Sequence, residues 1–196
     1  MTIVRLIKLA LLSLCLAGGY APALAADVSA GKSLAEGCAA CHGAEGVSEM
    51  PMTPSLAGQP DEYVQWQLVY FRSGARKSEI MVPVAEPLSN EEIRNLGAYY
   101  ASLPPPKPQT QPDALAQAGG KLAVEHRCRS CHSDDYNGFR AAARLSGQRE
   151  DVLLKALHEY KSGTRIGSGV ASMADVTFDL SDSDMQALAH YMASRR

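Results

Sequence analysis

The residues of this chain with the clearest chemistry lie in a pentapeptide, Cys-x-x-Cys-His, that occurs twice. The spacing is that of an attachment site for c-type haem, in which both thiols bond to the porphyrin and the adjacent His binds the iron. A fifth cysteine, Cys15, lies in what resembles a discarded leader, so the two motifs use every other cysteine. The motifs predict two covalent haems c per chain, held by Cys38, Cys41, Cys128 and Cys131, with His42 and His132 as iron ligands.

Three other uses of a Cys-x-x-Cys pair fit the sequence less well. A four-ligand zinc site needs a second pair of ligands nearby, and neither motif has one in the sequence around it. A redox-active dithiol needs no His directly after its second Cys and has no reason to occur twice. A plain disulfide is the third alternative. The repeated His, together with the predicted export of the chain, favours haem attachment over all three.

The role of each haem depends on the ligand opposite its histidine. A second His gives a bis-His centre, a Met raises the reduction potential and suits electron transfer, and an open position admits a ligand or substrate. The first half contains no His except His42, which excludes a bis-His haem there without a residue from outside that half. The remaining candidates are Met50, Met52 and Met81 in the first half, and Met173, Met185, Met192, His126, His158 and His190 in the second.

The repeat selects one methionine in each half. Met81 lies seven residues before Leu88, and Met173 lies seven residues before Leu180. Both positions are expected in a loop just ahead of the last helix of their half. We therefore predict Met81 and Met173 as the sixth ligands of the two irons.

The other candidates have simpler explanations. Met50 and Met52 have no counterpart in the second half, and two later methionines have the helical spacing of core residues. Two histidines are expected on helices as surface or hydrogen-bonded residues, and one lies too near its own haem-binding turn to reach the far side of that haem. These are Met185 and Met192, His158 and His190, and His126.

Each half is expected to fold as a short helical unit, because strand signals are sparse. A first helix leads into the haem motif, a middle helix follows a Gly-Gln pair, and a last helix begins at a capping-box-like sequence. The fold class is therefore all-α. The residues that mark the three helix starts are Asp27, Gln59 and Ser89 in the first half, and Asp113, Gln148 and Ser181 in the second.

The two halves are repeats on either side of a proline-rich segment. An offset of 89 residues pairs Gly58-Gln59 with Gly147-Gln148 and Gly31-Lys32 with Gly120-Lys121. Five prolines fall between Pro104 and Pro112, which favours an extended, semi-rigid spacer. We expect one domain at 26–103, a linker at 104–112 and a second domain at 113–196. Units of this size bury a modest core, which a covalently bound haem would staple.

The N-terminus has the features of a secretory signal peptide. Arg5 and Lys8 precede an apolar run at 9–16, and the small-x-small sequence at 23–25 predicts cleavage after Ala25. The run is too short to span a bilayer, which takes about 20 residues. We expect a signal peptide at 1–25 and an exported chain, which in a bacterium means the periplasm. Peripheral membrane association through an uncut leader is the alternative.

The chain resembles the dihaem cytochrome c4 family. The resemblance rests on the order Cys-x-x-Cys-His, Leu-x-Gly-Gln, aromatic-x-Ser-Gly-x-Arg, Met, Leu-Ser-x-x-x-Ile and Tyr-Tyr, most of which is repeated across the proline-rich segment. It covers nearly the whole chain after residue 25. It implies two tandem class I cytochrome c domains that face each other, His/Met ligation of both haems, and transport of electrons between respiratory donors and a terminal oxidase.

The second half departs from this family pattern. Pro54 matches the family proline whose carbonyl accepts the proton of the ligating His, whereas Ala143 stands at the corresponding position. A backbone carbonyl of Ala143 can still accept, but we expect a looser bond to His132, and such bonds tune the basicity of the ligand. Tyr63, Trp66 and Gln67 are likewise replaced, by Val152, Lys155 and Ala156.

Charge and ligand set together favour an electron carrier over an enzyme. Residues 26–103 carry ten acids and five bases, whereas residues 104–196 carry eleven acids and twelve bases. Such a polar molecule can orient itself at charged redox partners. These would be a membrane-bound or periplasmic electron donor and a terminal oxidase or reductase. We expect no nucleic-acid partner.

A subunit that accepts electrons from a periplasmic dehydrogenase is an alternative, and a dihaem peroxidase-like enzyme or a gas sensor would need an open iron.

Overall fold

The computed structural model describes residues 25–165 and 170–196. The expected signal peptide therefore lies outside the described residues, apart from Ala25. All regular secondary structure in the described ranges is helical, and the only sheet-like pairing there is an isolated bridge between Phe139 and Ala142. The all-α prediction is confirmed.

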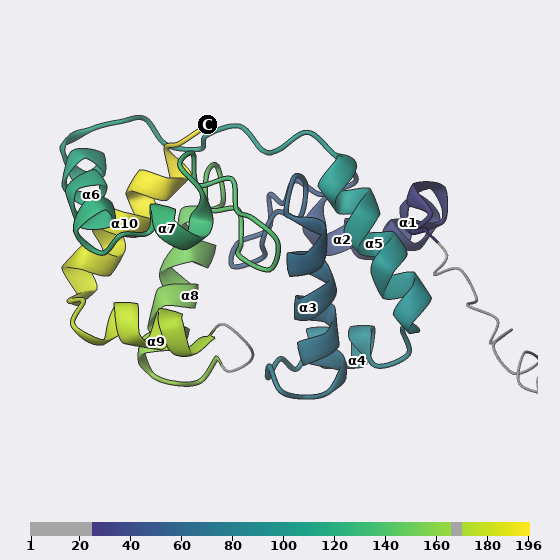
Figure 1. Ribbon diagram of the computed structural model, residues 1–196. Helices are drawn as coiled ribbons and strands as arrows, with labels where there is room; N and C mark the ends of the chain where they lie inside the picture. Colours follow the sequence, from purple (N-terminus) through teal and green to yellow (C-terminus); the bar gives the residue numbers. More distant parts are fainter. Residues whose placement is uncertain (1–24, 166–169) are drawn as a thin grey trace, which may run out of the picture.

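Each half forms its own bundle of helices, and the two bundles stand side by side (Figure 1). The haem motif of each half lies in a short helix after the first long helix. The helices of the first half are α1 (Val28–Ala35), η1 (Glu36–Cys38), α2 (Ala39–His42), α3 (Asp61–Arg72), α4 (Met81–Ala85) and α5 (Asn90–Ser102). Those of the second half are α6 (Ala114–Glu125), α7 (Arg129–His132), α8 (Glu150–Lys161), α9 (Val170–Phe178) and α10 (Asp182–Ala193).

The helix starts are those that the sequence predicts. The Asp27 carboxylate accepts hydrogen bonds from the first backbone N–H groups of α1, and Asp113 caps α6 in the same way. The Ser89 and Ser181 side chains each form a full capping box at the start of the last helix, with Glu92 and Asp184 as the reciprocal acceptors. These caps satisfy N–H groups that have no partner inside a helix.

One glycine in each domain lets the first helix approach the last helix closely. A Cβ at Gly31 would lie 2.1 Å from the Asn95 carbonyl oxygen on α5, and a Cβ at Gly119 would lie 2.0 Å from the Ala187 carbonyl oxygen on α10. Gly31 therefore corresponds in space to Gly119. The alignment of Gly31 with Gly120 is wrong by one residue, because a constant offset ignores the greater length of α6.

The apolar core of each domain lies between its first, middle and last helices. Both cores are built on the last helix of their domain, whose apolar residues Ile93, Leu96, Tyr100, Met185, Leu188 and Met192 are all buried. The buried cluster of the first domain comprises Ala35, Val64, Leu96, Tyr99 and Tyr100. That of the second domain comprises Ala123, Tyr136, Leu153, Leu180, Met185, Leu188, Ala189, Met192 and Ala193.

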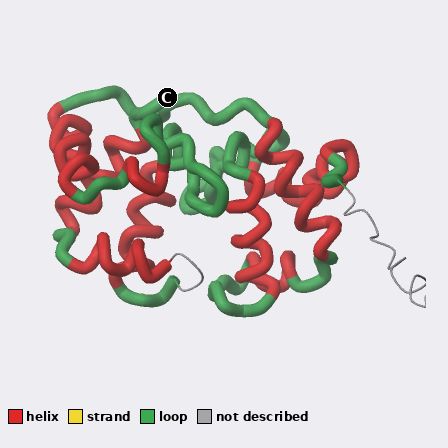
Figure 2. The backbone as a smooth tube through the Cα atoms, viewed as in Figure 1, coloured by secondary structure: helices red, strands yellow, loops and turns green. Residues whose placement is uncertain are grey.

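The proline-rich segment crosses from α5 to α6 as a loop without regular secondary structure (Figure 2). It is packed against the second domain, because Gln109 donates its backbone N–H to the Ala193 carbonyl over 3.2 Å and Pro106 is buried. A Cβ at Gly58 would lie 2.8 Å from the side chain of Pro105. The segment thus contacts both domains.

Within the described ranges, no helix is both long enough and apolar enough to cross a membrane.

Candidate haem sites

Each haem motif forms a single helical turn that ends abruptly. Helix α2 ends at Gly43, whose φ is 82°, and a Cβ there would lie 2.0 Å from the Val47 carbonyl oxygen. Helix α7 ends at Ser133, which adopts a similar φ of 69°. The positive φ turns the chain sharply, so that the segment after the motif returns to the histidine.

The thiols of the two motifs differ in exposure: Cys38, Cys41 and Cys128 are partly buried, and Cys131 is exposed. None of the cysteines within the described ranges is in a disulfide, and no cluster of three His, Cys, Asp or Glu side chains in those ranges could hold a metal ion. Burial raises the pKa of Cys38 and of Cys128 above the ordinary value for a thiol. A redox-active dithiol of the thioredoxin type has a lowered thiol pKa instead. The environment therefore argues against the redox-pair interpretation.

The two predicted iron-binding histidines have the same hydrogen-bonded environment. His42 Nδ1 lies 2.8 Å from the Pro54 carbonyl oxygen, and His132 Nδ1 lies 2.8 Å from the Ala143 carbonyl oxygen. Burial lowers the pKa of both histidines, against an opposing effect of these hydrogen bonds. A neutral ring that donates from Nδ1 keeps a lone pair on Nε2. Both histidines are therefore prepared to bind a metal through Nε2.

The looser bond expected at Ala143 is not found, since the two distances are equal. We call the loop that carries the Pro54 or Ala143 carbonyl the acceptor loop, and a second set of hydrogen bonds in each acceptor loop explains the equal distances. The backbone N–H groups of Leu56 and Ala57 donate to the Gly46 carbonyl, and those of Leu145 and Ser146 donate to the Tyr136 carbonyl, over 2.7–3.1 Å. These paired bonds fix the acceptor loop by its backbone, so that a proline is not required.

In each domain, the helix that contains the predicted methionine ligand lies at one end of the middle helix, and the haem motif lies nearer the other end. Helix α4, which starts at Met81, lies at the lower end of α3 in Figure 1, and α9, which contains Met173, lies at the lower end of α8. The motif helices α2 and α7 lie nearer the upper ends. Both methionines are partly buried. The short helices that contain the candidate ligands of each domain thus lie near opposite ends of the middle helix (Figure 1).

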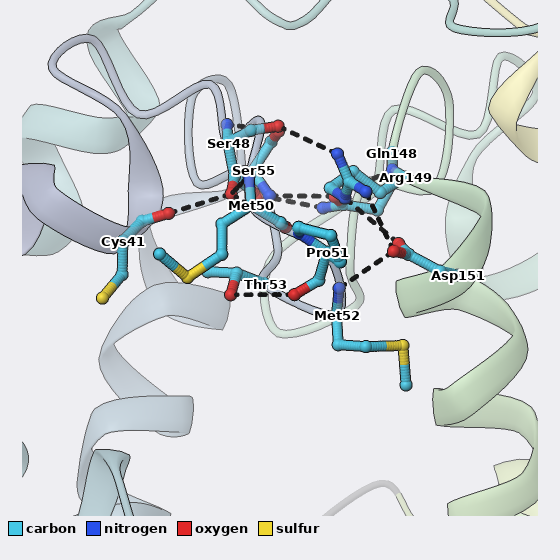
Figure 3. A network of polar contacts seen from close by, with 10 residues as sticks. All are labelled: Cys41, Ser48, Met50, Pro51, Met52, Thr53, Ser55, Gln148, Arg149 and Asp151. Atoms are coloured by element: carbon cyan, nitrogen blue, oxygen red, sulfur yellow. Dashed lines mark hydrogen bonds and ion pairs between the residues drawn. The ribbon is translucent and has the colours of Figure 1, made fainter.

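The other candidate ligands are engaged elsewhere. Met185 and Met192 are buried in the core, as predicted. Met50 and Met52 lie in an exposed turn at the domain interface, where the Met52 side chain points away from Cys41 (Figure 3). His190 contacts Glu150 over 2.8 Å and Asp113 over 3.2 Å. The exposed His158 lies on α8, and His126 caps the end of α6.

Apolar side chains near both methionines suit a large apolar cofactor. Ile80 precedes Met81 and is 70% exposed, and Val84 on α4 is 46% exposed. Phe178, at the end of the helix that holds Met173, is 76% exposed. A porphyrin offers an apolar surface that could cover such groups. With the paired thiols and the histidine Nε2 atoms, these residues fit haem c.

The domain interface contains a pair of glutamines that sequence reasoning noticed only as repeats. Gln148 donates from Nε2 to the Ser55 carbonyl and accepts at Oε1 from the Ser55 N–H, both over 2.9 Å. Gln59 donates to the Arg144 carbonyl over 2.9 Å and accepts from the Arg144 N–H over 3.0 Å. Because Ser55 and Arg144 are themselves one repeat apart, the two glutamines form a nearly two-fold symmetric pair of contacts.

Further polar contacts join the same faces. Asp151 accepts from the Met52 N–H over 2.9 Å, and Arg149 reaches the Ser48 carbonyl (Figure 3). Arg165 of the second domain donates to the Tyr63 hydroxyl and to Gln67 of the first, over 3.2 and 3.0 Å. No motif in the sequence singles out these contacts, because they join residues about 100 positions apart.

Comparison with known proteins supports the haem interpretation over both halves. A family model described as cytochrome c matches residues 28–104 and again residues 116–196. A cytochrome c4 of Pseudomonas aeruginosa is 33% identical over 177 residues, which cover 86% of this chain and 88% of that protein. A thiosulfate dehydrogenase electron acceptor of Thiomonas intermedia is 33% identical over 172 residues, covering 82% of this chain and 79% of that protein.

The fold agrees with a solved structure of the same kind. The structure of reduced recombinant cytochrome c4 from Pseudomonas stutzeri matches with a TM-score of 0.81 at 29% identity, covering 88% of this chain and 100% of that one. The likeness includes both domains and the connection between them. The chain belongs to the cytochrome c family as a two-domain cytochrome of the c4 type, an electron carrier with two covalently bound haems c.

Proposed function

We propose that the chain is a non-enzymatic electron carrier of the periplasm, whose mature form begins after Ala25. Residues 26–103 and 113–196 are the two haem domains, and residues 104–112 connect them. Thioether bonds from Cys38 and Cys41 hold the first haem, and bonds from Cys128 and Cys131 hold the second. The axial ligands are His42 with Met81, and His132 with Met173.

The observation that carries this proposal is the state of the two histidines. His42 is buried and His132 is partly buried, and each has Nδ1 bonded to a carbonyl oxygen over 2.8 Å. The carbonyl fixes the ring and its tautomer, which directs the Nε2 lone pair to the iron. A bound haem supplies a site for one electron. The protein would hold the histidine ligands of the haems in fixed positions through these hydrogen bonds.

Two ligands from the protein on each iron leave no position for a substrate. A peroxidase-like enzyme would need an open or displaceable ligand and an acid–base residue beside it. His190 has carboxylate partners, as an acid–base residue would. Its partners Asp113 and Glu150 stand at the starts of α6 and α8, so His190 lies among helix termini of the second domain. Saturated irons therefore favour the carrier over the enzyme.

An electron carrier requires redox proteins as its partners. A donor of the respiratory chain and a terminal oxidase or reductase would bind at the two domains, whose unequal charges can orient the molecule. A second candidate role is electron-accepting subunit of a periplasmic dehydrogenase. It is favoured by the Thiomonas intermedia relative, which is named a thiosulfate dehydrogenase electron acceptor.

Carbon monoxide binding tests the absence of an open site. The oxidised holoprotein is expected to show the weak near-infrared band of sulfur-to-iron charge transfer for both haems. The reduced holoprotein is expected to bind carbon monoxide poorly at neutral pH. Ready binding of carbon monoxide by either haem would contradict the carrier proposal and favour an enzyme or a gas sensor.

A further inference from the structure

The interface glutamines are joined to the predicted iron ligands through one peptide group each. The Pro54 carbonyl, which accepts from His42, and the Ser55 N–H, which donates to Gln148, belong to the same peptide group. The Ala143 carbonyl and the Arg144 N–H likewise form one peptide group between His132 and Gln59. A short hydrogen-bonded chain therefore runs from each histidine into the opposite domain.

The glutamine bonds of both chains are shielded from water, and the histidine bonds are partly buried. Gln59 is 4% exposed and Gln148 is 5% exposed, and the bonds to Ser55 and Arg144 are buried. In such surroundings, consecutive hydrogen bonds polarise one another. An acceptor on the peptide N–H increases the negative charge on the carbonyl oxygen of that peptide. The carbonyl then accepts more strongly from the histidine Nδ1–H.

We propose that Gln148 and Gln59 are positioning residues that act across the interface, each tuning the iron potential of the haem in the opposite domain. The inference rests on the proposed ligation by His42 and His132. A stronger bond from Nδ1 gives the imidazole more imidazolate character, which stabilises ferric iron and lowers the potential. Loss of either glutamine amide should therefore raise the potential of the haem across the interface.

The two arms are not equal. Gln148 Oε1 also accepts from the Arg149 N–H over 3.0 Å, so it divides its acceptor capacity between two donors. Within the described residues, Gln59 Oε1 accepts from the Arg144 N–H alone. The chain from Gln59 to His132 should therefore polarise its peptide more strongly.

The test uses Gln148→Leu and Gln59→Leu in the full chain with both haems attached, and each variant is the control for the other. Loss of one cooperative bond should raise the equilibrium constant for reduction about threefold, or about 28 mV for one electron. Gln148→Leu should move the first haem and Gln59→Leu the second, by a larger amount. Assigned NMR signals of the axial methionines during the titration identify the haem that moves.

A second control separates tuning from loosening of the interface. Tyr63→Phe removes the hydrogen bond between Tyr63 and Arg165, which reaches neither histidine peptide. It should leave the difference between the two potentials unchanged. The Nδ1–H proton signals of the reduced protein give an independent readout, since only the histidine opposite the substituted glutamine should shift.

The inference would be overturned by a shift of the haem in the substituted domain, by an equal shift of both haems, or by the same shift in Tyr63→Phe. No shift in either glutamine variant would do so as well. Failure of the proposed ligation is recognised separately, because the unsubstituted protein would then lack the near-infrared methionine band. A protein with that band but without the crossed shifts would refute this inference alone.

Discussion

The two domains hold their histidine acceptor loops with different residues in the same role. In the first domain the carbonyl that receives the paired N–H groups belongs to Gly46, at a φ of 73°, and a Cβ there would lie 3.1 Å from the Tyr100 ring. In the second domain it belongs to Tyr136, at a φ of 57°. The Tyr136 side chain is fully buried, edge-on to Tyr191 at 5.7 Å between ring centroids.

This difference shows which features of the site depend on backbone geometry and which depend on side chains. The histidine bond is 2.8 Å in both domains, although the turn residue and the acceptor residue both differ. The backbone bonds of the loop therefore suffice to place the acceptor. The side chains change the packing around it, because the second domain buries the Tyr136 side chain at this turn, whereas in the first domain the Tyr100 ring packs against the glycine.

The largest expected effect tests whether the domains use equivalent iron ligands. Met81→His should lower the potential of the first haem alone, and Met173→His that of the second, because imidazole favours ferric iron more than a thioether does. The shift should be on the order of 0.2 V, within the about 0.8 V range that axial ligands span. A redox titration followed by visible spectra measures it.

The matched control is Met52→Ala, which should leave both haems unchanged, since Met52 lies in the interface turn. Loss of a methionine signature in that variant would show that the alignment of the first domain with the second is wrong.

The next effect concerns the close helix contacts, and it checks the corrected alignment. Gly31→Ala and Gly119→Ala should each lower the free energy of unfolding by about 1–3 kcal/mol, because the new methyl group overlaps the facing backbone. Gly120→Ala should cost much less, since the nearest group to its Cβ is the Tyr191 ring at 3.2 Å. Chemical denaturation of the holoprotein measures all three. A larger cost at Gly120 than at Gly119 would restore the original alignment.

The capping boxes should respond alike in the two domains. Ser89→Ala and Ser181→Ala should each cost about 1 kcal/mol at neutral pH, the usual value for a lost N-cap. Hydrogen bonds from the serines lower the pKa of Glu92 and of Asp184. A carboxylate with a lowered folded-state pKa stabilises the fold above its unfolded pKa, and this stabilisation is lost as the pH falls.

The cost of both serine substitutions should therefore shrink in acid, below about pH 4, where free carboxylates become protonated. Denaturation of each variant at neutral and acidic pH tests this. A clearly unequal loss at neutral pH would mean that the two last helices depend differently on their caps.

The smallest expected effect is that of exchanging the two acceptor residues. Because the histidine bonds are equal in length, Pro54→Ala and Ala143→Pro should each change the reduction equilibrium less than about twofold, or about 18 mV. The remaining asymmetry is charge. Residues 26–103 have ten acids and five bases, and residues 104–196, which include the linker, have eleven acids and twelve bases. Positive surroundings favour the reduced iron, so the second haem should have the higher potential.

A redox titration that needs two components, with the higher one assigned to the second domain, would support this ordering. If Ala143→Pro lowered the potential of the second haem strongly, the acceptor residue and not the charge would be the main source of the difference.

The sequence alone was sufficient for the features that depend on local spacing. The Cys-x-x-Cys-His motifs, the caps at Asp27 and Ser89 and the apolar positions of the last helices involve residues within one or two helical turns of one another. Their physical effect is local, so their pattern is visible in one stretch of chain. The repeat extended these inferences to Met81 and Met173, whose ligation remains a prediction.

Only the tertiary structure decided the contacts between distant segments. The approach of Gly119 to Ala187, the equal histidine bonds and the crossed glutamines depend on how the helices and loops pack. The sequence around a glutamine in a Gly-Gln repeat does not indicate which peptide group, about 90 residues away, the side chain will contact. Packing decides whether Gln59 is a surface amide or a buried partner of Arg144. The N–H and carbonyl groups of Arg144 are removed from water, so they need hydrogen-bond partners, and Gln59 supplies them.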